Sequence, residues 1–226
     1  MNLYITKILF LIMFFSLSIS NAQEVDLSEI SISGNLIPTN KKDLGSTVTI
    51  LNQDDINNSP YPYFVDFIQN IPSVTIAQNG PKGSSSSVFV RGLGPEYVKV
   101  LIDGIDYGDV SSIPVTPNLS GIALSNLEKI EVLKGSQSAL YGSSAIGGVI
   151  SIITDDFSEN GNVNLEFGSF STIGLDLKKN FSGDNSDTSF YISEFTTDGF
   201  SAKYQGEEPD GYKSRTFSFA NKYYFS

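Results

Sequence analysis

The chain has 226 residues, with 14 lysines and arginines against 25 aspartates and glutamates, so its formal net charge is −11 at pH 7. This acidic balance argues against a surface that binds nucleic-acid phosphates. The chain has no cysteine and no histidine, which excludes disulfides and the hydrolytic and zinc mechanisms that need an imidazole. The sequence therefore predicts a protein that is not an enzyme.

The pattern of residues 1–22 is that of a secretory signal peptide. Lys7 precedes the uninterrupted apolar run Ile8–Phe15, and the small sequence Ser-Asn-Ala follows at 20–22. A basic start, a short apolar core and small residues before a cleavage point are typical of export signals. We expect the mature chain to begin at Gln23, and the alternative is an uncleaved N-terminal anchor.

A polar leader with spaced aliphatic residues is predicted for residues 23–45. Its alternating run Leu27–Ser33 has the pattern of an edge strand, or of an extended peptide that adds to the sheet of a partner. A plain flexible leader is the alternative.

From Ser46 the pattern becomes that of a folded domain. We predict strands at Ser46–Leu51, Val74–Ala77, Ser87–Val90 and Tyr97–Ile102, one short helix that starts at Asp54 and Asp55, and a second helix over Tyr63–Asn70. In the second helix Phe64, Phe67 and Ile68 recur at i, i+3 and i+4, which predicts an apolar stripe in the core.

Two long polar loops separate these strands. Gln78–Ser87 is rich in glycine and serine, and Asp106–Ser120 carries a tyrosine and two acids ahead of two prolines. Together they contain one cation, Lys82. Such loops either link strands flexibly or offer amide and hydroxyl groups to a large polar ligand.

Three charged residues lie at the ends or in the middle of predicted buried strands, namely Arg91, Asp103 and Glu131. An unpaired buried charge is costly, so we predict that they pair with one another and serve the structure rather than a ligand.

The most specific pattern is the stretch from Ile130 to Ile153, IEVLKGSQSALYGSSAIGGVISII. Its β-branched ends predict buried strands, and ALYG between them predicts one helical turn that Gly142 ends. This order closely resembles the end of the plug domain of TonB-dependent outer-membrane receptors, and RG, LIDG and IEV match the same plug signature. The resemblance implies an α+β plug domain, a small mixed sheet with short helices, over residues 46–155.

The resemblance also implies that the leader carries the TonB box, the segment that pairs with periplasmic TonB and its inner-membrane complex. The residues concerned are Leu27, Ser28, Glu29, Ile30, Ser31, Ile32 and Ser33.

Within this family, the run Asp55–Thr154 is most similar to the cobalamin transporters, which implies a corrinoid ligand. By that resemblance the ligand-facing positions are Asn79, Ser86 and Ser87, with Tyr107, Ser111 and Ser112 as further candidates. Siderophore receptors share the plug scaffold, so a ferric siderophore is the alternative. Loops with one cation suit a corrinoid of low charge better than an anionic ferric catecholate.

After Thr154 the pattern becomes that of a transmembrane β-barrel over residues 156–226. Apolar residues alternate with polar ones in Val163–Phe167, Ile173–Leu177 and Arg215–Phe225, which predicts one face toward lipid and one toward the lumen. The run Thr188–Thr197 alternates less well and is the third of four predicted strands. A half-buried soluble sheet is the alternative. A barrel that encloses a plug needs about twenty-two strands, so we expect the chain to be a truncated part of an outer-membrane receptor.

An acidic loop, EEPDG at 207–211, lies between the last two predicted strands. The resemblance to cobalamin transporters implies calcium ligands there, at Glu208 and Asp210, and a solvated acidic loop is the alternative. No other cofactor is predicted.

The resemblance therefore implies TonB-dependent import of a scarce nutrient across the outer membrane, with cobalamin as the first candidate. A ferric-siderophore receptor is the second interpretation, and a soluble periplasmic module that binds or signals through the plug is the third.

Overall fold

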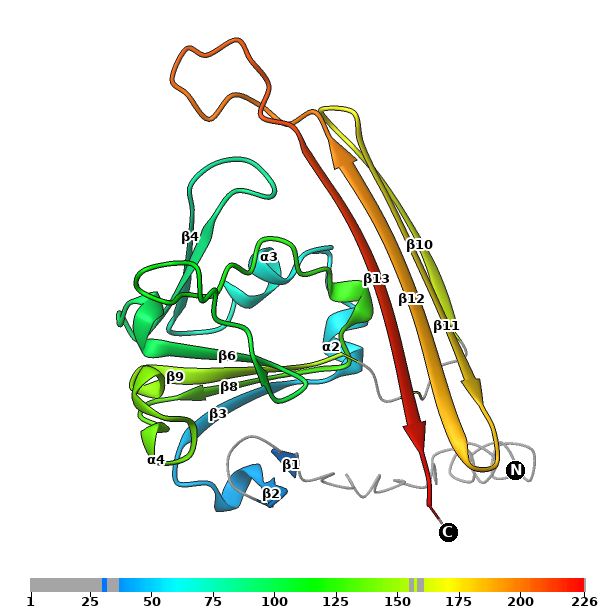
Figure 1. Ribbon diagram of the computed structural model, residues 1–226. Coiled ribbons are helices and arrows are strands. Elements are labelled where there is room, and N and C mark those ends of the chain that lie inside the picture. Colours follow the sequence, from blue (N-terminus) through cyan, green and yellow to red (C-terminus); the bar gives the residue numbers. More distant parts are fainter. Residues whose placement is uncertain (1–29, 32–36, 155–156, 158–160, 226) are drawn as a thin grey trace, which may run out of the picture.

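The computed structural model describes residues 30–31, 37–154, 157 and 161–225, and it has two parts that stand side by side (Figure 1). One part is a compact body of short helices and strands, and the other is a tall, curved antiparallel sheet. The predicted signal peptide and the expected first mature residue, Gln23, lie outside the described residues.

A five-stranded mixed sheet in the order β3-β8-β9-β6-β7 forms the centre of the compact body. Its strands are β3 (Thr47–Leu51), β8 (Lys129–Lys134), β9 (Gly148–Ile153), β6 (Val98–Ile102) and β7 (Ile105–Asp106). Strand β9 pairs antiparallel with β8 and parallel with β6. The predicted small mixed sheet is confirmed, and the two strands read from the 130–153 stretch are its centre.

Short helices and a hairpin surround this sheet. They are α2 (Gln53–Asn57), α3 (Phe64–Ile68), α4 (Ser138–Tyr141), the 3-10 turns Lys41–Asp43, Pro95–Tyr97, Leu124–Asn126 and Ser143–Ala145, the hairpin β4 (Val74–Gln78) with β5 (Ser86–Val90), and the pair β1 (Ile30–Ser31) with β2 (Thr39–Asn40).

Helix α3 is shorter than the predicted helix over Tyr63–Asn70. The Asn70 side-chain amide donates to the backbone carbonyls of Asp66 and Phe67, at 2.9 and 3.1 Å. Asparagine competes with the helical hydrogen bonds in this way, and Pro72 follows, so the helix ends early. The predicted apolar stripe is present, with Phe64 and Ile68 fully buried and Phe67 packed at the edge of the core.

Both faces of the sheet are covered by apolar side chains. One face packs against α2, α3 and the β4–β5 hairpin in a large cluster that includes Phe64, Val132 and Ile150. The other face packs Leu133 and Val149 in a smaller cluster. A strand that is buried on both faces reads as a continuous apolar run, which explains why the sequence of β8 and β9 does not alternate.

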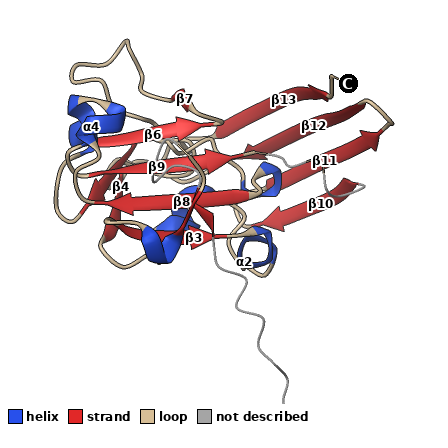
Figure 2. Cartoon of the chain, turned by 90° about the horizontal axis from the view of Figure 1, so that it is seen from below, coloured by secondary structure: helices blue, strands red, loops and turns tan. Residues whose placement is uncertain are grey.

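The tall sheet, which we call the wall, consists of four antiparallel strands in sequential order. They are β10 (Gly161–Gly168), β11 (Thr172–Ser182), β12 (Ser186–Thr197) and β13 (Tyr212–Tyr223). Figure 2 shows the wall beside the five-stranded sheet. Each strand of the wall is longer than the alternating run that predicted it.

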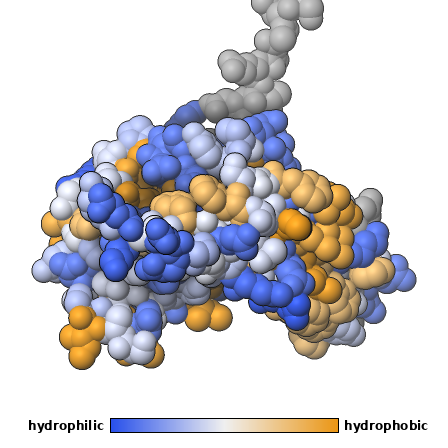
Figure 3. Space-filling model, turned by 90° about the horizontal axis from the view of Figure 1, so that it is seen from above, coloured by the Kyte–Doolittle hydropathy of each residue, from blue (hydrophilic) through white to orange (hydrophobic). Residues whose placement is uncertain are grey.

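The two faces of the wall differ in polarity, as the alternation predicts. The outward face carries large exposed apolar side chains: Val163, Leu165, Phe167, Ile173, Leu177, Phe190, Ile192, Phe217 and Phe219. They form the apolar surface at the right of Figure 3. The face toward the compact body carries mostly polar residues such as Asn164, Asp176 and Ser193. Among the described residues, no helix is long and apolar enough to cross a membrane.

The predicted pairing of Arg91 with a buried carboxylate is wrong. Arg91 is exposed and has a positive φ of 53°, and it forms no ion pair within the described part of the chain. Glu131 is fully buried, and its Oε1 forms an ion pair with Lys129 Nζ at 2.8 Å. Asp103 instead accepts hydrogen bonds from the backbone N–H and the hydroxyl of Thr154, at 2.9 and 2.8 Å. Glu131 thus pairs with a residue two positions away and Asp103 with one 51 positions away, and the spacing of charges in the sequence did not reveal either partner.

Candidate ligand-binding site at the plug apex

Two loops meet at one end of the compact body, and we call them together the apex. The first, residues 79–85, connects β4 to β5, and the second, residues 107–121, follows β7. They correspond to the two polar loops that the sequence singled out. The structure therefore brings together segments that the sequence could only propose to be neighbours.

A hydrogen-bond network joins the two loops. Asn118 Oδ1 accepts from the hydroxyl of Ser86 at 3.2 Å and from the hydroxyl of Ser120 at 2.9 Å. The backbone N–H of Leu119 donates to Ser86 Oγ at 2.9 Å. Ser86 and Ser120 are buried, so these bonds are shielded from water and hold the second loop against the hairpin.

A cavity of about 500 Å³ lies between the loops and the wall. Its lining is polar and aromatic, and comprises Gly83, Asp106, Tyr107, Gly108, Asp109, Asn118, Ser120, Gly121 and Tyr212. This volume lies within the range of known ligand pockets. Tyr212 is the first residue of β13, so the wall contributes one side of the cavity.

At Gly83 the backbone of the first loop lies close to the ring of Tyr212 in the wall. This glycine has a φ of 85°, and a Cβ on it would overlap the ring of Tyr212. The close approach of the backbone to the ring therefore requires glycine.

The predicted ligand-facing residues fall in three different environments. Tyr107 lines the cavity, and Asn79 is exposed at the start of the first loop. Ser86 is buried in the network with Asn118, which leaves it a structural role, and Ser87 is half-buried within β5. Direct contact of Asn79, Ser86 or Ser87 with a ligand remains a prediction.

Ser111 and Ser112 shape the second loop. The backbone N–H and the hydroxyl of Ser111 both donate to Asp109 Oδ1, at 2.8 and 2.6 Å. The Ser112 hydroxyl donates to the carbonyl of Pro114 at 2.9 Å. Their expected ligand contact is a prediction that these bonds do not test. Asp109, Asn118 and Tyr212 also line the cavity, without having been predicted as ligand-facing residues.

The apex is anionic because both of its nearby lysines are paired. Lys82 forms an ion pair with Asp66 of α3, and Lys99 forms one with Asp106. Burial raises the pKa of Asp106, but hydrogen bonds from Lys99 and from the Gly108 N–H, with the charge of Lys99, lower it below its usual value overall. The hydroxyl and the backbone N–H of Ser111 lower the pKa of Asp109. Both carboxylates are therefore charged at neutral pH.

The predicted TonB box lies largely outside the described residues. Leu27, Ser28, Glu29, Ile32 and Ser33 are not described, while Ile30–Ser31 form β1, which pairs antiparallel with Thr39–Asn40. Pairing of this segment with TonB stays a prediction.

The predicted calcium ligands lie in the loop between β12 and β13. Both Glu208 and Asp210 are exposed, and Asp210 Oδ2 accepts a hydrogen bond from the Ala202 N–H at 2.7 Å. Within the described ranges, no three Asp, Glu, His or Cys side chains gather as a metal site would need. Calcium binding at Glu208 and Asp210 stays a prediction.

A match to a protein family covers most of the compact body. The sequence model of the TonB-dependent Receptor Plug Domain matches residues 40–149. These residues include the five-stranded sheet up to the start of β9, the hairpin and both loops of the apex.

The compact body, most of which matches this family model, is called the plug from here on.

Solved structures share the fold of the plug and the adjoining wall. The pyoverdine outer membrane receptor FpvA from Pseudomonas aeruginosa, bound to pyoverdine, matches over 84% of this chain with a TM-score of 0.67 and 14% identity. The siderophore receptor PiuA from Acinetobacter baumannii matches over 82% with a TM-score of 0.63 and 20% identity. The FrpB iron transporter from Neisseria meningitidis matches over 79% with a TM-score of 0.63 and 16% identity.

The matched portion is a minor part of each solved receptor. The alignments cover 27% of FpvA, 25% of PiuA and 29% of FrpB. The chain thus spans about a quarter of the receptors that it resembles. At these identities the likeness concerns the fold of the plug and wall.

Proposed function

We propose that this chain is part of a TonB-dependent outer-membrane receptor that imports a bulky, scarce nutrient. The observation that carries the proposal is the pairing of a plug, which has a cavity at its apex, with a wall that is apolar outside and polar inside. A wall of this kind suits contact with the outer-membrane lipid on one face and the plug on the other. A soluble periplasmic module would leave that apolar face in water, which large exposed patches rarely tolerate.

The mechanism that we propose is transport rather than catalysis. A ligand enters the apical cavity from outside, and its binding shifts the leader around residues 27–33 between a docked and a released state. The released segment pairs with TonB as an added strand, and TonB then draws on its inner-membrane complex to remodel the plug.

An iron–siderophore complex is the first candidate ligand. It is supported by the solved structures with the same fold, whose names describe siderophore receptors and an iron transporter. Cobalamin is the second candidate, favoured by the charge of the apex. Lys82 and Lys99 are both neutralised by carboxylates, and Asp109 adds a negative charge. An anionic ferric catecholate is therefore the least suitable ligand for this face, and a neutral ferric hydroxamate or a corrinoid is more suitable.

Uptake by a complete receptor that contains this chain tests the proposal. The receptor is expressed in cells that lack other outer-membrane importers, with and without TonB, and radiolabelled neutral ferric trihydroxamate and cyanocobalamin are supplied separately. We expect TonB-dependent uptake of the trihydroxamate. Uptake of cyanocobalamin alone would reverse the choice of ligand, and equal uptake of either compound without TonB would refute the mechanism.

A proline at Ile30 provides the second arm of this experiment. Proline removes a backbone donor and blocks the addition of a strand, so Ile30→Pro should abolish uptake while leaving surface binding of the ligand unchanged. Leu36→Pro, outside the predicted box, is the matched control and should retain most of the uptake.

A further inference from the structure

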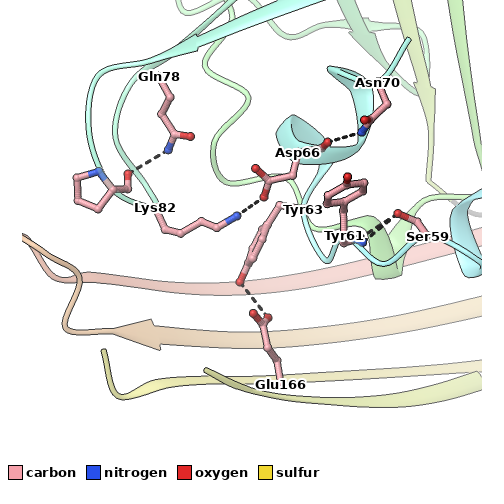
Figure 4. Close-up of polar contacts among 9 residues, drawn as sticks. Ser59, Tyr61, Tyr63, Asp66, Asn70, Gln78, Lys82 and Glu166 are labelled. Atoms are coloured by element: carbon pink, nitrogen blue, oxygen red, sulfur yellow. Dashed lines mark hydrogen bonds and ion pairs between the residues drawn. The ribbon is translucent and has the colours of Figure 1, made fainter. Parts of the chain in front are cut away.

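The tip of the first apical loop contacts the place where the plug and the wall meet. We call this place, where Tyr63 of the plug contacts Glu166 of the wall, the seam. The ammonium of Lys82 forms an ion pair with Asp66 in α3, and it lies 3.8 Å from the centre of the Tyr63 ring (Figure 4). The hydroxyl of Tyr63 donates to Glu166 Oε2 on β10 at 3.3 Å. One lysine thus connects the loop to a plug helix and, through Tyr63, to the wall.

Aromatic rings extend the same connection across the wall. Tyr63 meets Phe195 of β12 edge-on, with the ring centres 5.2 Å apart. Phe195 lies 6.1 Å from Tyr212 of β13, and Tyr212 covers Gly83, the residue next to Lys82. The loop tip is therefore held by a cation at one residue and by an aromatic ring at the next.

The same loop tip forms one side of the apical cavity, because Gly83 lines it together with Tyr212. Any shift of residues 82–83 changes the shape of the cavity. The Lys82–Asp66 pair is partly exposed, with side-chain exposures of 33% and 32%. A pair of this kind is weak enough to open reversibly.

We propose that Lys82, held by Asp66 and by the ring of Tyr63, is a positioning residue that fixes the apical loop against the plug–wall seam and so prepares the cavity for its ligand. The ligand part of this inference rests on the proposed function. We call the contacts of Lys82 with Asp66 and Tyr63 the clasp. The clasp and the bound ligand stabilise each other, because thermodynamic linkage makes the effect of each on the other reciprocal. Opening the clasp lowers the affinity by reducing the fraction of receptor whose cavity is already formed.

Loop mobility tests the clasp without any ligand. These 226 residues contain no cysteine, so Ser85→Cys carries a single nitroxide spin label in a complete receptor, in detergent micelles, from whose remaining residues any cysteine has been removed. We expect Lys82→Met to increase the mobility of this label, and Lys82→Arg to leave it near the parent value. Lys99→Met removes the other apical lysine pair, with Asp106, and is the matched control that should not change the mobility. An unchanged spectrum for Lys82→Met would overturn the clasp.

A covalent tether distinguishes positioning from direct contact with the ligand. A Cβ on Gly80 would lie 3.3 Å from the Cβ of Ala202 in the loop between β12 and β13, close to the separation in disulfides. Lys82→Met should weaken the binding of a neutral ferric trihydroxamate about 5- to 10-fold, as expected for the loss of a partly exposed ion pair and a cation–π contact. The disulfide between Gly80→Cys and Ala202→Cys should restore the affinity to within about 2-fold.

Each result has a defined meaning. Rescue by the disulfide, and loss of that rescue on reduction, support a positioning role. Absence of rescue with an intact disulfide means that Lys82 contacts the ligand itself, which overturns the proposal. If the parent receptor binds no trihydroxamate, the proposed ligand class fails, and the spin-label result alone decides whether the clasp exists.

Discussion

The plug and the wall use apolar residues in opposite ways. In the plug the largest side chains point inward, and Phe64 is fully buried between α3 and the central sheet. In the wall they point outward, and Phe167 is 74% exposed, while Asn164 and Asp176 face the plug. The comparison shows that one chain can bury its large apolar side chains in one part and expose them in another, so burial alone does not reveal what these side chains do in each part.

Removal of a core ring should produce the largest effect. Phe64→Ala leaves a cavity in the plug core, so we expect the free energy of unfolding to fall by about 3–5 kcal/mol. Phe217→Ala, on the outward face of the wall, is the matched control and should change plug stability by about 0.5 kcal/mol or less. Urea unfolding of the complete receptor in detergent, followed by near-ultraviolet circular dichroism, measures both values. Equal losses of unfolding free energy for the two variants would mean that the exposed ring of the wall stabilises the protein as much as the buried ring of the plug.

A charge on the outward face of the wall should have the next largest effect. Leu165→Arg places a cation toward lipid, at a cost of about 2–4 kcal/mol if the site lies near the bilayer midplane. We expect a lower fraction of the complete receptor to insert into phosphatidylcholine bilayers during refolding. Leu165→Phe keeps the face apolar and should insert as the parent does. Normal insertion of Leu165→Arg would indicate that the outward face does not contact lipid.

The contact between the plug and the wall at Tyr63 should make the free energy of unfolding fall at alkaline pH. Burial, and then the charge and hydrogen bond of Glu166, raise the pKa of Tyr63 well above its ordinary value of 10. Above pH 10 the phenol ionises in the unfolded chain but remains protonated in the folded one, so stability falls as the pH rises. The slope from this group reaches about 1.4 kcal/mol per pH unit.

The measurement compares the parent with Tyr63→Phe by urea unfolding between pH 9 and 11. Phenylalanine keeps the ring and has no proton to lose, so its stability should decline less steeply. Tyr97→Phe, at an exposed position, is the control for the general effect of alkaline pH. Parallel curves for the parent and Tyr63→Phe would show that Tyr63 is accessible to water.

The smallest effect is expected at Arg91. Because its side chain is exposed, Arg91→Ala should change the free energy of unfolding by about 0.5 kcal/mol or less. Asp103→Ala removes two hydrogen bonds to Thr154 and should cost about 1–3 kcal/mol. A loss at Arg91 larger than the loss at Asp103 would restore the buried ion pair that the sequence suggested.

Those parts of the fold that depend on local pattern were predictable from the sequence. The 130–153 stretch has β-branched runs and glycines at its turns, and it forms β8, α4 and β9 with small shifts at their ends. The alternation in Val163–Phe167 also gave the correct face for each residue. In both cases the periodicity of side chains along one strand carries the information.

The apex was less predictable because its contacts join distant segments. Ser86 is buried in a network with Asn118, from the other loop, which accepts its hydrogen bond, and its expected contact with a ligand stays a prediction. Tyr212 lies before the predicted strand Arg215–Phe225, and nothing local indicates that its ring covers Gly83. Which side of a hairpin is exposed depends on which distant segment packs on it, and the local sequence pattern does not identify that segment.

The strand order of the plug sheet has a consequence for how the chain acquires its structure during synthesis. The early strands β3 and β6 are not neighbours, because β8 and β9 lie between them and come from the last part of the plug. A chain that emerges from its N-terminus therefore cannot complete any part of the β3-β8-β9-β6 pairing until Lys129 and the residues after it are available. Early collapse is delayed by this late arrival of the central strands, since non-local pairing must wait for its partner. The five-stranded sheet is therefore completed only after β8 and β9, near the end of the plug, have been synthesised.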